Sequence, residues 1–200
     1  MTAPRRKRRS DATRSIERLT ATAREVFGER GHDVALDEIA RRAGVGNATL
    51  YRHFPTRSDL LIAVYSEEVQ ELCRRGADLL AYPDPVLALR TWLDHFVVHV
   101  ATKRTLALDA AAGAGAERGA IFAGWHDSMI STADALLGRA RDQIRSGVTA
   151  RDLLALANGA ALAGADIGQS HRILRLAWDG LARPTPERNA LSGRDPEAAS

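Results

Sequence analysis

The sequence predicts an all-α fold. Alternating runs of β-branched residues, which are typical of strands, are missing, and aromatic residues make up only 5% of the 200 residues. Apolar residues instead recur at the i, i+3, i+4, i+7 spacing of amphipathic helices. We expect about nine helices, with a three-helix N-terminal head followed by a larger helical domain.

Glycine and proline delimit the helices of the head. The first helix is predicted over residues 11–30, and Gly31 follows it, where a left-handed C-cap favours glycine. A short second helix is predicted over residues 36–43. A third begins at Gly46 or Asn47 and ends before Pro55. One face of the first helix is apolar, formed by Ile16, Leu19, Ala23, Val26 and Phe27.

A capping box opens the fourth helix. Thr56 is followed three residues later by Asp59, so hydroxyl and carboxylate can satisfy each other's backbone N–H groups. We expect this helix to run to about Ala81, because Pro83 and Pro85 then break it. The later helices are predicted over 85–103, 119–145, 149–165 and 170–182, with 107–115 either helix or loop.

Composition limits the classes of protein. No run reaches the roughly 18 apolar residues of a membrane span, and no apolar segment follows the basic N-terminus as in a secretory signal. Cys73 is the single cysteine, which excludes an internal disulfide and favours a cytoplasmic protein. Residues 1–58 carry 13 Lys and Arg against 7 Asp and Glu, so the excess of positive charge lies at the N-terminus. The run Arg5–Arg9 is either a solvated tail or an arm that binds nucleic acid.

The segment from Asp37 to Arg52 predicts two short helices that meet at a tight turn. Gly44 stands where the turn needs a left-handed residue, and Ala40 is small enough for a close helix crossing. Ile39, Val45 and Leu50 are spaced to fill the wedge between the helices. The alternative is an ordinary helical hairpin with a polar surface. The preceding apolar helix, the basic arm and the capped fourth helix favour a DNA-binding helix-turn-helix.

The outward face of the third helix carries the candidate DNA contacts. Its side chains are mostly uncharged hydrogen-bonding groups, which suit base edges and phosphates: Asn47, Ala48, Thr49, Tyr51, Arg52 and His53. A binder without sequence preference would depend more on Lys and Arg. We therefore expect double-stranded DNA as the partner, read at defined sequences.

Two runs resemble the TetR family of bacterial regulators. They are Ala43–Phe54, continued by Thr56–Leu61, and the earlier run Ala23–His32. Specific similarity covers about residues 13–65. The resemblance implies a helix-turn-helix domain (13–71) and a helical ligand-binding and dimerisation domain (72–183). The basic run before them indicates a flexible arm (1–12), and the Pro-, Glu-, Ser- and Arg-rich composition after them indicates a disordered tail (184–200).

The resemblance also implies a function. Members of the family are homodimers that bind a palindromic operator in the major groove, and repression released by a small-molecule effector is the default, although activation stays open. The position of Tyr51 typically holds a phosphate through its hydroxyl, and Arg57 occupies a phosphate-facing site. At the position of Ala35 the family usually has a capping Ser or Thr, so the second helix either starts differently or is capped by Asp33 or Asp37.

The last two helices predict the dimer interface. Residues 153–164 are small on nearly every face, which lets helices approach closely, and the family pairs this helix with the next one. A buried helix within one chain is the alternative. The interface residues that we expect are Leu156, Gly159, Ala160, Ala163, Leu174 and Trp178.

Candidate effector contacts are aromatic and polar residues at helical spacing. They are Trp92, Phe96, His99, Phe122, Trp125 and Met129, although plain core is the alternative for each. His95 and His99 have the spacing of two zinc ligands on one helix, but no third ligand is nearby, so we expect no metal. No Gly-rich phosphate loop or nucleophile motif is present, so we expect no cofactor and no enzymatic activity.

Overall fold

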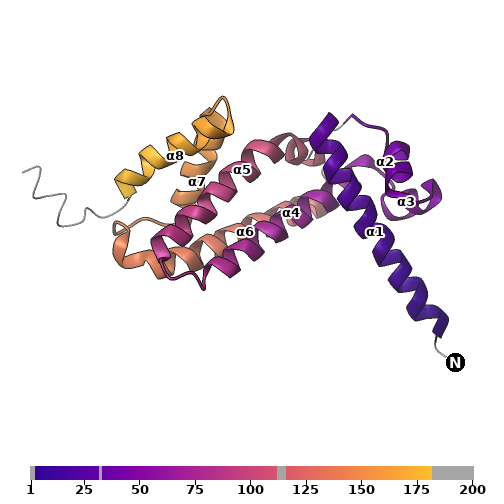
Figure 1. Ribbon diagram of the computed structural model, residues 1–200, viewed down its shortest axis with the longest axis horizontal. Helices are drawn as coiled ribbons and strands as arrows, with labels where there is room; N and C mark the ends of the chain where they lie inside the picture. The colour runs from indigo at the N-terminus through magenta and orange to yellow at the C-terminus, as the bar shows by residue number, and fades with distance from the viewer. Residues whose placement is uncertain (1–2, 32, 112–115, 182–200) are drawn as a thin grey trace, which may run out of the picture. The chain divides into compact units, whose positions relative to one another are not determined.

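The computed structural model describes residues 3–31, 33–111 and 116–181, with side chains described for 11–31, 33–101 and 119–181. These residues form eight α-helices and one 3₁₀ helix, η1 (Figure 1), and the all-α prediction is therefore confirmed. The elements in chain order are α1 (Ala3–Arg30), α2 (Leu36–Ala43), α3 (Asn47–His53), α4 (Arg57–Leu79), α5 (Pro85–Ala111), α6 (Ala116–Ala140), η1 (Arg141–Gln143), α7 (Ala150–Ala163) and α8 (Ile167–Leu181).

Several helices are longer than the sequence predicted. α1 begins at Ala3 rather than Asp11, so the segment predicted as a flexible arm is helical from Ala3 onward. Arg and Lys are good helix formers, and a proline in the first turn, here Pro4, is compatible with a helix. α5 likewise continues to Ala111 through an alanine-rich stretch. The predicted disordered tail at 184–200 lies outside the described residues.

The chain divides into two compact units. The first unit combines Met1–Glu71 with Thr102–His126, and the second combines Leu72–Ala101 with Asp127–Ser200. α4, α5 and α6 each contribute residues to both units. Each compact unit is therefore built from two separate stretches of the sequence, and neither is one continuous N-terminal or C-terminal segment.

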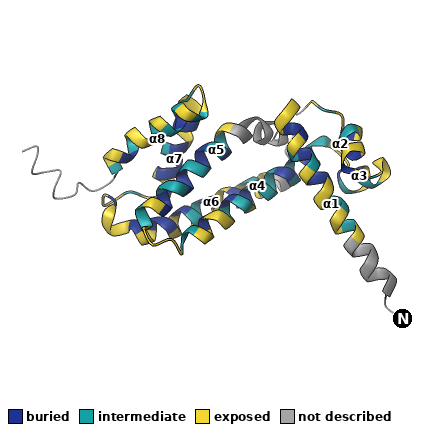
Figure 2. Ribbon diagram, viewed as in Figure 1, coloured by how far each residue is buried: buried dark blue, intermediate teal, exposed yellow. Residues whose placement is uncertain are grey.

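The core of the first unit lies between α1, α2, α3 and the start of α4. The buried faces of these helices appear dark blue in Figure 2. The apolar face predicted for α1 is buried there, since Leu19, Ala23 and Val26 are fully inaccessible and pack with Ile39 and Leu50. Polar contacts add to this packing: the Arg24 guanidinium on α1 forms ion pairs with Glu67 and Glu68 on α4.

The second unit is held by close helix packing. The Trp92 indole on α5 is fully buried and donates a hydrogen bond to the Leu72 carbonyl at 3.0 Å. Gly76 on α4 is what allows this approach, because a Cβ there would lie 2.9 Å from Trp92 Nε1 and closer still to Thr132. Thr149 caps α7 through a second capping box with Asp152, which the sequence analysis missed.

Candidate nucleic-acid interface

The turn between α2 and α3 has the geometry that the sequence predicted. Gly44 caps α2 in the left-handed conformation, with φ 61° and ψ 36°. The Gly44 N–H donates to the Arg41 carbonyl at 3.2 Å, and the Val45 N–H donates to the Ala40 carbonyl at 3.0 Å. These two bonds satisfy carbonyls that a helix end leaves unpaired, so the turn is rigidly specified.

The wedge between α2 and α3 is filled as predicted. Ile39, Ala40 and Leu50 are fully inaccessible, and Val45 is partly buried against the same cluster. Ala40 contributes only a methyl group at the crossing, which leaves room for the apolar side chains of α3. The packing of one face of α3 leaves its opposite face directed away from the core.

The residues proposed to contact DNA lie on that outward face and at the start of α4. Asn47, Ala48, Tyr51 and Arg52 are exposed, whereas Thr49, His53 and Arg57 are partly exposed. In the described part of the chain, the buried His53 Nε2 atom has no hydrogen-bond partner. The structure therefore brings the proposed contacts together on α3 and α4, while their contact with DNA stays a prediction.

The capping box of α4 is confirmed and positions Arg57. The Thr56 N–H and hydroxyl donate to Asp59 Oδ2 at 2.9 and 2.7 Å, and the Asp59 N–H donates to the Thr56 hydroxyl oxygen at 3.2 Å. The cap fixes Arg57 as the first helical residue of α4. A cation next to a helix N-terminus provides a favourable site for a phosphate.

Tyr51 makes a contact that the sequence analysis did not predict. Its side chain on α3 is 46% exposed, and its hydroxyl donates to Asp37 Oδ1 on α2 at 3.0 Å. This hydrogen bond is the main cause that raises the pKa of Tyr51 above its ordinary value of 10.0. Ala35 makes no side-chain cap of α2, and Asp37 does not replace it, because its carboxylate accepts from Tyr51 instead.

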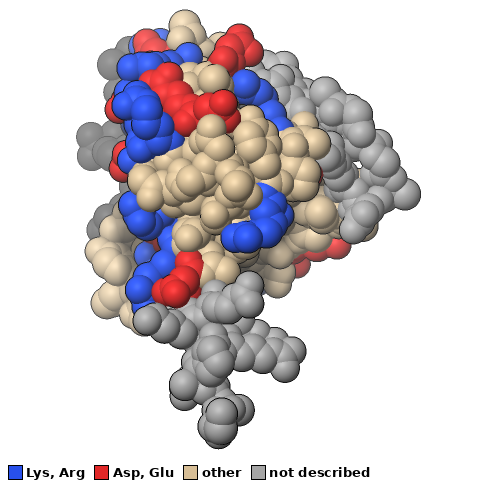
Figure 3. Space-filling view, turned by 90° about the vertical axis from the view of Figure 1, so that its right-hand side faces the viewer, with Lys and Arg blue, Asp and Glu red and all other residues tan. Residues whose placement is uncertain are grey.

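Ion pairs neutralise other charges of α2. Glu38 pairs with Arg30 at 2.8 Å and with Arg42 at 3.6 Å, and Arg42 also pairs with Glu29 at 3.1 Å. Figure 3 shows blue and red side chains around a central uncharged area on this side of the molecule. A largely uncharged surface bordered by charges suits a binder that reads base edges more than one that depends on charge alone.

The residues predicted for the dimer interface separate into two groups. Ala160, Leu174 and Trp178 are buried within the chain at 2%, 2% and 6% exposure, because α7 and α8 pack on each other. They are largely covered by their own chain, and their contribution to a surface between protomers stays a prediction. Gly159 and Ala163 are exposed, and Leu156 is partly exposed. The sequence analysis did not name two exposed leucines, Leu162 (44% exposed) and Leu176 (71% exposed). The helical spacing of α7 and α8 could have identified both.

The residues predicted for the effector site are divided between the two compact units. In the second unit, the Trp92 and Phe96 rings lie 5.9 Å apart, and the Phe96 and His99 rings 6.5 Å apart; Met129 in that unit is buried. In the first unit, Phe122 and Trp125 pack edge to face at 4.9 Å. No group of three potential metal ligands occurs among the described residues. None of the described helices is long and apolar enough to cross a membrane.

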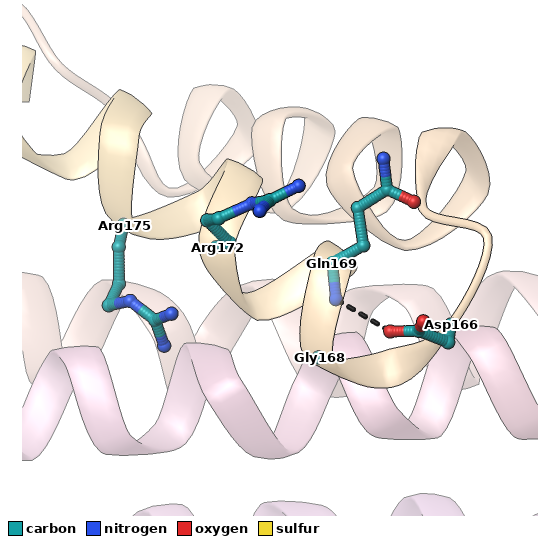
Figure 4. A pocket seen from close by; sticks show the side chains of 5 residues that line it. All are labelled: Asp166, Gly168, Gln169, Arg172 and Arg175. Carbon is teal, nitrogen blue, oxygen red and sulfur yellow. Dashed lines mark hydrogen bonds between the residues drawn. The ribbon is translucent and has the colours of Figure 1, made fainter.

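A shallow hollow lies at the start of α8 (Figure 4). Its volume is about 400 Å³, and it is lined by Asp166, Gly168, Gln169, Arg172 and Arg175. Asp166 Oδ1 accepts from the Gln169 N–H at 2.8 Å, so the helix N-terminus already has a carboxylate as its cap. The hollow is polar and open, and none of the predicted effector contacts lines it.

Comparison with known families gives two matches that together cover most of the chain. Residues 19–64 match the family described as bacterial regulatory proteins, tetR family. Residues 84–183 match the domain described as transcriptional regulator SbtR-like, C-terminal domain. The first match contains α2, α3 and the turn between them.

Solved structures with a similar fold extend the comparison to most of the chain. A TetR transcriptional regulator from Streptomyces coelicolor is 35% identical, covers 85% of this chain and 99% of its own, and has a TM-score of 0.66. A TetR regulatory protein from Mycobacterium vanbaalenii is 32% identical, with coverages of 88% and 99% and a TM-score of 0.67.

Curated relatives are similar over a short part of the chain. The transcriptional activator FasR of Mycolicibacterium smegmatis is 46% identical over 55 residues, which is 27% of this chain and 25% of that protein. A transcriptional regulator of Staphylococcus aureus is 36% identical over 62 residues, or 30% of this chain and 34% of that protein. The chain thus matches about a quarter to a third of the length of these relatives.

Proposed function

Because this chain belongs to the TetR family of bacterial transcriptional regulators, we propose that it is a homodimeric repressor that releases a palindromic operator when a small molecule binds its C-terminal helices. DNA binding itself follows from the family, which consists of regulators and not of enzymes. The observation that carries the proposal is the α2–Gly44–α3 geometry, which leaves a polar, largely uncharged face of α3 accessible.

Within the head, we assign base reading and phosphate binding to different residues. Asn47 and Thr49 lie on the outward face of α3, where amide and hydroxyl groups suit base edges. Arg57 and the Tyr51 hydroxyl suit phosphates, which position the protein without reading sequence. Removing a base contact therefore has a different consequence from removing a phosphate contact.

The test compares Asn47→Ala with Arg57→Ala. The operator is a duplex that the wild-type protein selects from a random-sequence pool, and a scrambled duplex serves as random DNA. We expect Asn47→Ala to cost about 1–3 kcal/mol on the operator and almost nothing on random DNA. Arg57→Ala should weaken both duplexes and reduce the slope of log K against log salt by about 1.

Arg151→Ala removes the same charge from an exposed position outside the head and serves as the control. It should change neither affinity nor slope. Equal losses on both duplexes for Asn47→Ala would contradict the assignment of base reading to α3. Failure of the pool to yield any preferred duplex would contradict sequence-specific regulation.

For the dimer we propose the outward face of α7 and α8. Gly159, Leu162 and Ala163 on α7 and Leu176 on α8 are exposed in the single chain. Among the residues that the structure describes, a Cβ at Gly159 would have no neighbour within 4 Å, which supports an approach by a second copy at this position. Exposed small and apolar groups on adjacent helices support a four-helix bundle between two protomers.

Sedimentation velocity tests this face with Gly159→Leu and Leu176→Glu. Each change should shift the protein from dimer toward monomer, because one overfills a close contact and the other places a charge in it. The control is Gly138→Leu, which adds the same bulk at an exposed position of α6, where a Cβ would also have no neighbour within 4 Å in the described part of the chain. If both variants remain dimeric, the interface lies elsewhere.

For the effector, we propose contacts from Phe96, His99 and Met129, which are buried in the second unit. A buried apolar surface with a histidine beside it suits a mainly apolar small molecule with one polar group. A library of such molecules, screened for release of the operator, tests the proposal. Phe96→Ala should abolish the response to an active compound while operator binding persists. Release that increases transcription indicates repression, and release that decreases it indicates activation.

A further inference from the structure

Asp37 is an acidic side chain next to the Tyr51 hydroxyl, which we propose to bind a DNA phosphate. It lies in the first turn of α2, is exposed, and accepts the Tyr51 hydroxyl at 3.0 Å. Its neighbour Glu38 is engaged with Arg30 and Arg42. In the described part of the chain, no Lys or Arg lies within ion-pair distance of Asp37, whose recorded partner is the Tyr51 hydroxyl.

A phenol has one proton to donate. In the structure the Tyr51 hydroxyl donates that proton to Asp37, so it cannot donate to a phosphate at the same time. A phosphate oxygen at hydrogen-bond distance from Tyr51 would also stand within a few ångströms of the Asp37 carboxylate. Two anions this close repel each other, and the repulsion is strongest where the duplex excludes water.

We propose that Asp37 limits the affinity of the head for all DNA, because it holds the Tyr51 hydroxyl in the free protein and must release it before that hydroxyl can bind a phosphate. This inference rests on the assignment of Tyr51 to phosphate given above. Phosphate contacts carry no base identity, so Asp37 weakens binding to operator and random DNA alike. Its effect in the cell is lower occupancy of the many non-specific sites that compete with an operator.

The test is Asp37→Asn, which removes the charge while keeping the size of the side chain. An asparagine amide can donate to the Tyr51 oxygen and so leaves the phenolic proton available for DNA. We expect affinity to rise about two- to tenfold on both duplexes, as for a gain of one hydrogen bond. The salt slope should steepen by up to about 1 as one repulsive charge is removed.

Asp33→Asn is the matched control. Asp33 lies in the loop before α2 and is exposed. Asp33→Asn removes the same charge as Asp37→Asn, but the hydrogen bond to Tyr51 is made by Asp37. If Asp33→Asn raises affinity as much as Asp37→Asn does, the gain reflects net charge and the proposal is wrong. Unchanged or reduced affinity of Asp37→Asn also overturns it.

A double-mutant cycle with Tyr51→Phe separates the hydroxyl from the charge. The gain from Asp37→Asn should be clearly larger with tyrosine at this position than in the Tyr51→Phe background, since phenylalanine has no proton to release. Equal gains in both backgrounds would show that Asp37 acts by repulsion alone and would overturn its role through Tyr51.

An absorbance titration of the free protein checks the hydrogen bond without DNA. The Asp37 contact raises the pKa of Tyr51, so Asp37→Asn should lower the pKa of one tyrosine of the three in the chain. A lowered pKa with unchanged DNA affinity confirms the contact and overturns the proposed effect on binding. If the wild-type protein selects no operator, the proposed function fails instead, and the titration still reports on the contact.

Discussion

Gly76 provides the sharpest test of the packing in the second unit. This glycine is buried in α4, and a Cβ added to it would lie 2.9 Å from Trp92 Nε1 and would clash still more closely with Thr132 Cγ2. Gly76→Ala therefore forces the Trp92 indole or the Thr132 side chain to move. The indole is fully buried and bonded to the Leu72 carbonyl, so it has little freedom to do so.

Three contributions determine the size of the effect. Overpacking of a filled core costs about 1–3 kcal/mol, and loss of the indole hydrogen bond costs about 1 kcal/mol more. Replacing glycine by alanine within a helix returns about 1 kcal/mol. The free energy of unfolding should therefore fall by about 1–3 kcal/mol, and Tm by about 2–4 °C per kcal/mol in a chain of this length.

Gly138→Ala on α6 is the matched control, because Gly138 is exposed and a Cβ there meets none of the described residues within 4 Å. The same substitution should raise Tm by a few degrees through helix propensity alone. Both variants are compared by thermal unfolding at equal protein concentration, which keeps any dimer contribution constant. A Gly76→Ala variant as stable as the wild type, or more stable, would refute the close approach of α4 to Trp92.

Three further predictions concern stability. Thr149→Ala should lower the free energy of unfolding by about 1 kcal/mol in urea titrations, since it removes the N-cap of α7, and Thr149→Ser should restore it. Burial, and next the charge of Arg75, lower the pKa of His95 below 6.5. As pH falls below 6.5, the imidazole is protonated in the unfolded state before it is protonated in the folded state, so the free energy of unfolding should decrease. His95→Gln should make the free energy of unfolding depend less on pH in this range. Burial raises the pKa of Tyr65 to about 12 from 10.0, so stability should fall between these pH values as the unfolded state loses its proton, and Tyr65→Phe should remove this loss.

The head was largely predictable because its structure follows from local rules. The bounds of α2, the left-handed Gly44 and the capping box at Thr56 each depend on residues a few positions apart. The outward face of α3 follows from the same helical periodicity that buries Leu50. The match over residues 19–64 confirms the family and with it DNA binding, while the assignment of DNA binding to that face stays a prediction.

The start of α1 and the end of α5 could not be read from apolar spacing. Both extensions run through stretches rich in Arg or Ala, where helix propensity is high but no apolar stripe continues. Periodicity reports where a helix packs, and not how far it continues beyond the packed region. The sequence therefore predicted that these segments are helical but not where α1 begins or where α5 ends.

Contacts between residues far apart in the chain needed the tertiary structure. The sequence alone determined that α8 is amphipathic, but not that Leu174 and Trp178 are buried within the chain while Leu176 stays exposed. It also placed Tyr51 on the helix that we predict to face DNA, without revealing Asp37 as its partner. Helical spacing defines the faces of each helix, whereas the neighbour that covers a face depends on how all the helices pack together, and only the folded chain decides that.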